Sequence, residues 1–110
     1  MIQGAQRTLI CAGQTAADAD GNLLYAGDMA KQISQALDNL ETVLKQAGFT
    51  LADVVRLNYY TTDVDGFIAA ADVFGGRLAA AGCRPASTLL GVSRLAFPGQ
   101  VVEIEATAVA

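Results

Sequence analysis

The chain contains no histidine and no tryptophan, and only two of its 110 residues are cysteine. Histidine is the usual general base at neutral pH and the commonest protein ligand of metal ions, so its absence argues against zinc hydrolases and Ser-His-Asp hydrolases. Cys11 and Cys83 stand in apolar or turn contexts, without the spacing of a metal site. We therefore predict two free thiols, no metal site and no cofactor.

Charged residues are also scarce, at 16% of the chain against roughly 25% in a typical soluble domain. Some apolar surface is therefore expected to be covered by other subunits. Seven basic and eleven acidic residues give a net charge of −4 and a pI near 4.4. The basic residues are scattered, whereas a nucleic-acid partner requires grouped Lys and Arg. We expect no nucleic-acid partner.

Long apolar runs are missing too. No run approaches the roughly 20 residues of a membrane span, and no charged leader precedes an apolar stretch. A length of 110 residues suits one domain that builds a core without a covalent or metal staple. We expect a single domain over residues 1–110, soluble and cytoplasmic, with no membrane partner.

The remaining pattern predicts an α+β fold. Residues 2–12 favour a hairpin, residues 29–47 a helix capped by Asp28 and stopped by Gly48, and residues 54–62 a strand. A second helix is expected over residues 63–82, weakened at Gly75 and Gly76, and Pro85 then begins the final strands. These elements predict a two-layer sandwich, in which a six-stranded mixed sheet carries two helices on one face.

The last strand alternates strictly. Val102, Ile104, Ala106 and Ala108 share one face, and Glu103 and Glu105 project from the other. Adjacent acids on one face need water or partners, because a buried unpaired carboxylate is costly. We expect the helix-free sheet face to carry five residues and to support self-association around a closed axis. The five residues are Glu103, Glu105, Ser87, Leu89 and Gly91.

Five short motifs, in this order and spacing, together resemble the Rid family of reactive intermediate deaminases. They are Ala12-Gly13-Gln14, Leu37-Asp38-Asn39-Leu40, Tyr60-Thr61-Thr62-Asp63, Arg84-Pro85-Ala86-Ser87 with Arg94-Leu95, and Glu103-Ile104-Glu105-Ala106. The resemblance covers essentially the whole chain. It implies a chorismate-mutase-like homotrimer, whose clefts between subunits bind small enamines and imines such as 2-aminoacrylate. It also implies an Arg after Pro-Ala that grips the substrate carboxylate, and a Glu on the last strand that positions water.

Glu103 matches that catalytic Glu, but the rest of the expected site departs from the family pattern. Ser87 stands in place of the Arg, Leu89 in place of a thiol, and Ala12 in place of a small polar residue, and the amino-terminal segment is short. Arg84 is a poor substitute, because three residues along a strand span about 10 Å and reverse the face. The expected ligand-binding residues are Gly13, Ser87, Thr88, Leu89 and Arg84.

Three functions remain open at this stage. The first is a deaminase-like hydrolase with an altered substrate, in which Glu103 orients water and backbone groups near Gly13 and Thr88 hold a small keto or imino acid. The second is a non-catalytic trimer that binds or senses a small metabolite. The third, a chorismate-mutase-type pericyclic enzyme, has less support, because a dianionic substrate requires several cationic groups. The candidates for that role are Arg7, Arg56, Arg84 and Arg94.

Overall fold

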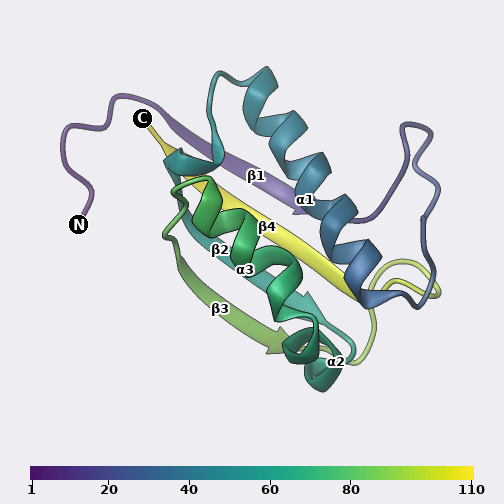
Figure 1. Ribbon diagram of the computed structural model, residues 1–110. Helices are drawn as coiled ribbons and strands as arrows, with labels where there is room; N and C mark the ends of the chain where they lie inside the picture. Colours follow the sequence, from purple (N-terminus) through teal and green to yellow (C-terminus); the bar gives the residue numbers. More distant parts are fainter.

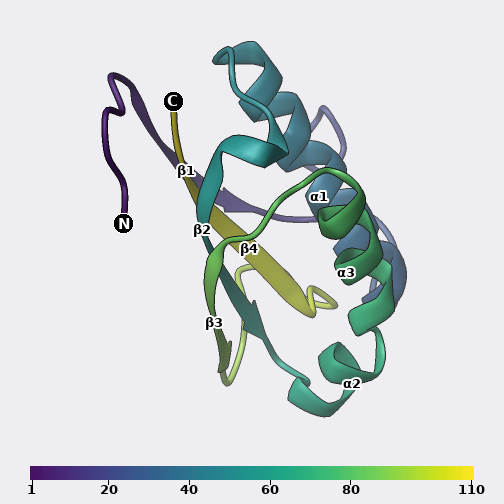
Figure 2. The ribbon, with the colours of Figure 1, turned by 60° about the vertical axis from the view of Figure 1, so that its left-hand side comes forward.

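The computed structural model describes residues 1–110 as a sheet with helices packed on one face (Figures 1 and 2). The sheet has four strands in the order β1-β4-β2-β3, and only β2 and β3 run parallel. Along the chain the elements are β1 (Thr8–Gln14), α1 (Met29–Gln46), the 3-10 turn η1 (Leu51–Asp53), β2 (Val54–Thr61), α2 (Val64–Ala69), α3 (Ala71–Ala80), β3 (Ala86–Gly91) and β4 (Val102–Val109). The predicted α+β two-layer class is confirmed.

The prediction of six strands is wrong, chiefly because the first hairpin does not form. Residues 1–7 contain no strand, and β1 pairs instead with β4, Thr8 lying opposite Val109. A three-residue segment such as Ile2–Gly4 offers few ladder hydrogen bonds, and an isolated two-stranded hairpin is marginal in water. Strand β4 is longer, and its buried and half-buried residues alternate, so one face of β4 packs on the core. Pairing with β4 therefore gives β1 a stable partner strand.

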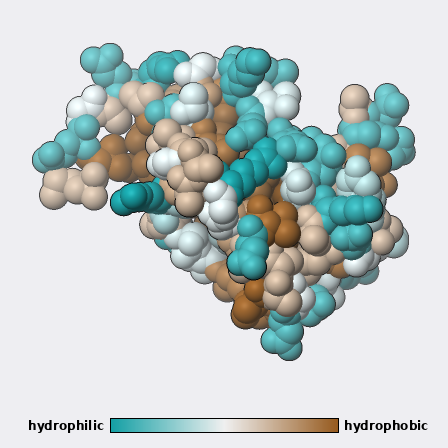
Figure 3. All heavy atoms as spheres, in the orientation of Figure 1, coloured by the Kyte–Doolittle hydropathy of each residue, from teal (hydrophilic) through white to brown (hydrophobic).

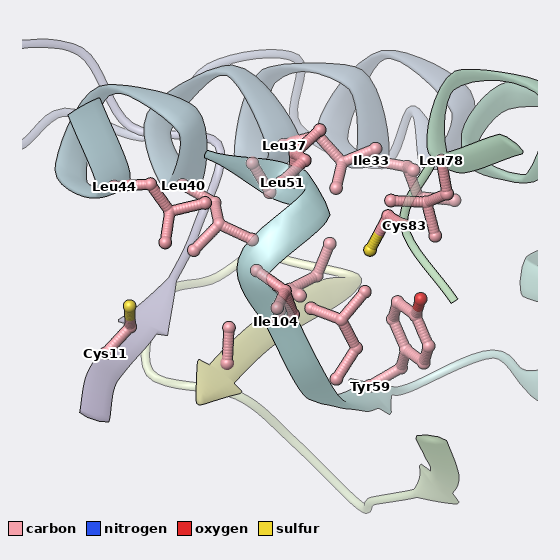
Figure 4. Close-up of a cluster of buried hydrophobic side chains, with 14 of the residues drawn as sticks. Cys11, Ile33, Leu37, Leu40, Leu44, Leu51, Tyr59, Leu78, Cys83 and Ile104 are labelled. Carbon is pink, nitrogen blue, oxygen red and sulfur yellow. The ribbon is translucent and has the colours of Figure 1, made fainter. Parts of the chain in front are cut away.

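The predicted first helix is confirmed, and it supplies five of the 18 residues of the buried core. Asp28 caps α1 by accepting a hydrogen bond from the Lys31 amide at 3.1 Å, and Gly48 follows the helix with a φ of +81°. Such a positive φ suits glycine. Figure 4 shows side chains of α1 pointing toward the sheet, where they meet Ile104. The fully buried apolar residues of this helix face are Ile33, Ala36, Leu37, Leu40 and Leu44.

The predicted second helix is two helices, α2 and α3, separated at Ala70. The break does not fall at Gly75 and Gly76, which lie inside α3 with open space around them. After the turn at Ala70, α3 lies beside α1, and Arg77 binds Asp38 at 2.7 Å. The apolar periodicity continues through the break, so the sequence pattern carried no signal for it.

The faces of β4 match the prediction, but those of β3 do not. In β3, Ser87 and Leu89 lie opposite Leu57 and Tyr59, which are buried on the helix side. Thr88 faces the other way, and its hydroxyl accepts a hydrogen bond from Arg56 Nη2 at 2.6 Å. Placing Ser87, Leu89 and Gly91 on the helix-free face was therefore wrong. The face depends on the register of β3 on β2, and a one-residue difference reverses it.

Candidate functional site

Glu103 and Gly13 meet where β1 pairs with β4. Cys11 lies opposite Ala106 and Gln14 opposite Ile104, so β1 contains one extra residue and bulges between them. A Cβ built on Gly13 would lie 2.8 Å from Cδ of Glu103 and 3.0 Å from its Oε1. The Glu103 carboxylate can lie over the β1 backbone only because position 13 has no side chain. Bulges of this kind often re-aim side chains beside active sites.

The two glutamates of β4 have different surroundings. Glu105 Oε1 accepts hydrogen bonds from the Tyr60 hydroxyl at 2.5 Å and from Asn58 Nδ2 at 3.1 Å. The Tyr60 bond and then the Asn58 bond lower the pKa of Glu105, and the same Tyr60 bond raises the pKa of the phenol. Glu103 lies opposite Tyr60 and is half-buried, without a hydrogen bond or ion pair from its carboxylate. Glu103 is therefore the carboxylate available to water or a ligand.

Tyr60 and Asn58 are parts of this site that the sequence reasoning missed. Both project from β2 on the helix-free face, and Asn58 Oδ1 is buried without a partner. Asn58 helps to line a hollow of about 140 Å³ that also includes Arg56 and Glu105. The alternation of polar residues in β2 with buried Leu57 and Tyr59 was the signal that could have identified them.

The predicted residues on and before β3 do not join Glu103 within one chain. Ser87 lies opposite Leu57, three residues along β2 from the partner of Glu103, and on the other face. Three residues of strand span about 10 Å. Leu89 packs against the core, and Arg84 precedes β3 at the end of the sheet away from Glu103. Thr88 shares the face of Glu103, but its hydroxyl is bonded to Arg56.

A larger cavity of about 650 Å³ reaches Gly13 from the side of α1. It lies between this helix and the loop that follows β1. Asn39 holds that loop through Nδ2, which donates to the carbonyls of Thr15 at 2.8 Å and Ala17 at 2.9 Å. The backbone beside Gly13 is therefore tied to the helix layer as well as to β4.

Both cysteines are free, as predicted, and the structure shows that both are buried. Burial raises the pKa of the Cys11 and Cys83 thiols, which makes them weak nucleophiles. No group of three or more His, Cys, Asp or Glu side chains is arranged to hold a metal ion. None of the helices combines the length and apolar character that crossing a membrane requires.

The fold and the site together define an α+β domain with a carboxylate poised over a glycine bulge, and comparison with known proteins identifies its family. The family model described as Endoribonuclease L-PSP matches residues 2–110. The chain belongs to this family, which also carries the names Rid and YjgF. The family resemblance seen in the sequence is confirmed.

Several relatives cover most of the chain. A 2-iminobutanoate/2-iminopropanoate deaminase from Capra hircus is 33% identical over 103 residues, which are 94% of this chain and 73% of that protein. Protein mmf2, mitochondrial, from Schizosaccharomyces pombe is 34% identical over 102 residues, covering 91% of this chain and 78% of that protein.

Two solved structures show the same architecture. The Rid-family protein YyfB of Yersinia pestis, described as of unknown function, has a TM-score of 0.87 and 39% identity, covering 99% of this chain and 83% of that one. The YjgF gene product of E. coli has a TM-score of 0.82 and 26% identity, covering 99% and 84%. The YjgF-type fold expected from the resemblance is confirmed, with a sheet of four strands in this chain.

Proposed function

We propose that this protein is an imine deaminase-like hydrolase of a small keto- or imino-acid-related substrate, with Glu103 as its catalytic residue. The observation that carries the proposal is the unpartnered Glu103 carboxylate over Gly13. A carboxylate without internal partners can hold and deprotonate a water molecule. The imino-acid deaminase among the relatives supports this class of reaction. No step of it requires a metal or cofactor.

We further propose that Ser87 occupies the position at which the deaminating members carry an Arg for the substrate carboxylate. A charge-assisted contact of that kind contributes roughly 1.5 to 3 kcal/mol, so its loss weakens substrate capture by about ten- to a hundredfold. The protein is therefore expected to act slowly on the standard imines, or to act on a different substrate.

A homotrimer is the assembly that we propose. Ile10 on β1 is 80% exposed and Leu90 on β3 is 50% exposed, both on the helix-free face. Hydrophobic atoms also gather at the lower edge of Figure 3, over α2 and the end of β3. Two edge strands and these exposed apolar side chains on the sheet face favour association. We propose that this assembly places Ser87 of one chain near Glu103 of another. Light scattering that gives a mass near 11.3 kDa would reject the assembly.

The deaminase proposal has a direct assay. An amino-acid oxidase generates 2-iminopropanoate, and semicarbazide traps whatever imine the protein has not hydrolysed. We expect the protein to raise the rate of imine hydrolysis slightly above the uncatalysed rate, and this increase should disappear in Glu103→Gln. A relative that carries the Arg serves as the positive control. A rate equal to that of the relative, or a rate that survives Glu103→Gln, would contradict the proposal.

The alternative is a non-catalytic trimer that binds or senses a small metabolite, and Ser87 is the observation that favours it. Binding of a small keto acid without imine hydrolysis would select this alternative. A ribonuclease reading has less support, because the net charge is −4 and no histidine is present. A cytoplasmic location stays a prediction.

A further inference from the structure

The loop between β3 and β4 carries an arginine that has no partner within the chain. Arg77 is paired with Asp38, Arg7 stacks on Phe49, and Arg56 bonds to Thr88. Arg94 makes neither a hydrogen bond nor an ion pair, and the same holds for Arg84 before β3. Arg94 is exposed and lines a cavity of about 330 Å³. Thr62, Ser93, Leu95, Phe97 and Val101 line it as well.

The electrostatic character of this cavity is opposite to that of the protein. No carboxylate lines it, so its one charged group is the Arg94 guanidinium, in a chain whose net charge is −4. A guanidinium binds a carboxylate through two parallel hydrogen bonds, and the hydroxyls of Thr62 and Ser93 add possible donors. Leu95 and Phe97 offer apolar contact to a short carbon chain. The volume lies in the range of small-molecule sites.

Two buried amides hold the loop in one conformation. Gln32 of α1 donates through Nε2 to the Gly99 carbonyl at 2.9 Å, and its Oε1 accepts from the Val101 amide at 2.9 Å. Gln100, 3% exposed, donates to the Val102 carbonyl at 3.2 Å and accepts from the Phe97 amide at 3.3 Å. A loop fixed in this way keeps a cavity formed before any ligand arrives, which lowers the cost of binding.

The cavity lies at the same end of the sheet as the candidate catalytic carboxylate. Thr62 follows β2 and Val101 precedes β4, and the Thr62 amide donates to the Val101 carbonyl at 3.3 Å. Alternation places Val101 on the same face as Glu103, two residues away, which is about 7 Å along a strand. Arg94 thus lies at the same end of the sheet as Glu103, whereas Ser87 and Arg84 lie elsewhere.

We propose that this cavity binds the carboxylate of a small 2-oxo or 2-imino acid and that Arg94 is its anchor, in place of the Arg that Ser87 has replaced. The choice of acid rests on the proposed function, but the binding step does not, because it requires no hydrolysis. A single cation without neighbouring acids suits a monocarboxylate better than a polyanion.

The test is a titration of the isotope-labelled protein with pyruvate, followed by the backbone amide resonances. We expect saturable shifts at Thr62, Ser93 and Arg94, and a dissociation constant that rises about ten- to a hundredfold in Arg94→Gln. Arg94→Lys keeps the charge but loses the paired hydrogen bonds, so its dissociation constant should lie between those of the wild type and Arg94→Gln. Lys45→Gln, on the exposed last turn of α1, removes the same charge and should change the constant less than twofold.

Several results would overturn the proposal. Pyruvate shifts confined to Ser87 and Thr88, or unchanged in Arg94→Gln, would exclude Arg94 as the anchor. Equal shifts with inorganic phosphate would exclude a carboxylate-specific cavity. If imine hydrolysis is absent but these pyruvate shifts occur, the proposed function fails and this site stands. If imine hydrolysis depends on Glu103 and the KM for the imine is the same in Arg94→Gln as in the wild type, the proposed function stands and this site fails.

Discussion

Gln32 links α1 to two loops, so replacing it tests how the end of the sheet is held. Its side chain is fully buried, with Nε2 donating to the Tyr25 and Gly99 carbonyls at 3.0 and 2.9 Å and Oε1 accepting from Val101 N at 2.9 Å. In Gln32→Leu all three hydrogen bonds disappear, although the volume changes little. Leucine thus isolates the polar contribution of the amide.

The expected loss follows from what each partner retains. The Tyr25 carbonyl still accepts from the Asp28 amide, and the Gly99 carbonyl from the Gly27 amide, so each loses one of two bonds. The Val101 amide loses its side-chain acceptor and is left unsatisfied, which costs roughly 1 to 3 kcal/mol. The two lost carbonyl bonds add roughly 0.5 to 1.5 kcal/mol each. The buried leucine offsets part of this total, and we expect about 2 to 4 kcal/mol less free energy of unfolding.

Urea denaturation at a fixed protein concentration measures this loss, because association makes stability depend on concentration. The melting temperature should fall by roughly 4 °C for each kcal/mol, and amide hydrogen exchange at Val101 should accelerate. Gln46→Leu, at an exposed position near the end of the same helix, is the matched control. A loss below about 1 kcal/mol relative to this control would refute the reasoning, since it would mean that an unmet buried amide costs little.

Three further outcomes are expected around the candidate site. Gly13→Ala should lower the rate of any imine hydrolysis by about ten- to a hundredfold, because the new Cβ displaces the Glu103 carboxylate. The melting temperature should change little, because the end of the flexible Glu103 side chain can move. The double variant Gly13→Ala, Glu103→Gln should lose no more hydrolysis rate than Glu103→Gln alone. Because the Tyr60 hydrogen bond lowers the pKa of Glu105, the stability that this carboxylate contributes is present above its ordinary pKa of 4.5 and is lost as the pH falls through the lowered value. The difference in free energy of unfolding between wild type and Glu105→Gln, measured in urea, should therefore shrink between pH 7 and pH 3. A difference that stays constant would contradict this. Ser87→Arg should strengthen pyruvate binding or speed hydrolysis beyond the wild-type level only at concentrations where the protein is oligomeric, because Ser87 and Glu103 lie on different faces of one chain. Calorimetry on a dilution series in which the monomer shows the same gain over wild type would contradict it.

Local patterns were enough to predict one helix and two strands correctly, namely α1, β2 and β4. The apolar spacing of α1 and the alternation of β4 follow from the periods of helix and strand, which each segment carries in its own residues. The same alternation placed Glu103 and Glu105 together on the face away from the core. The family motifs added the YjgF-type fold, which periodicity does not specify.

Other features depended on which distant segments pair. The register of β3 on β2 decided that Ser87 lies on the helix side, and the bulge in β1 brought Gly13 under Glu103. Gln32 meets Gly99 across 67 residues of sequence and Val101 across 69. A single segment does not encode such contacts, because a shift of one residue in a strand pair reverses every side chain. The sequence by itself therefore determined the first helix and the faces of β4, and its family motifs singled out Glu103. Only tertiary pairing decided the faces of β3 and which residues share a site with Glu103.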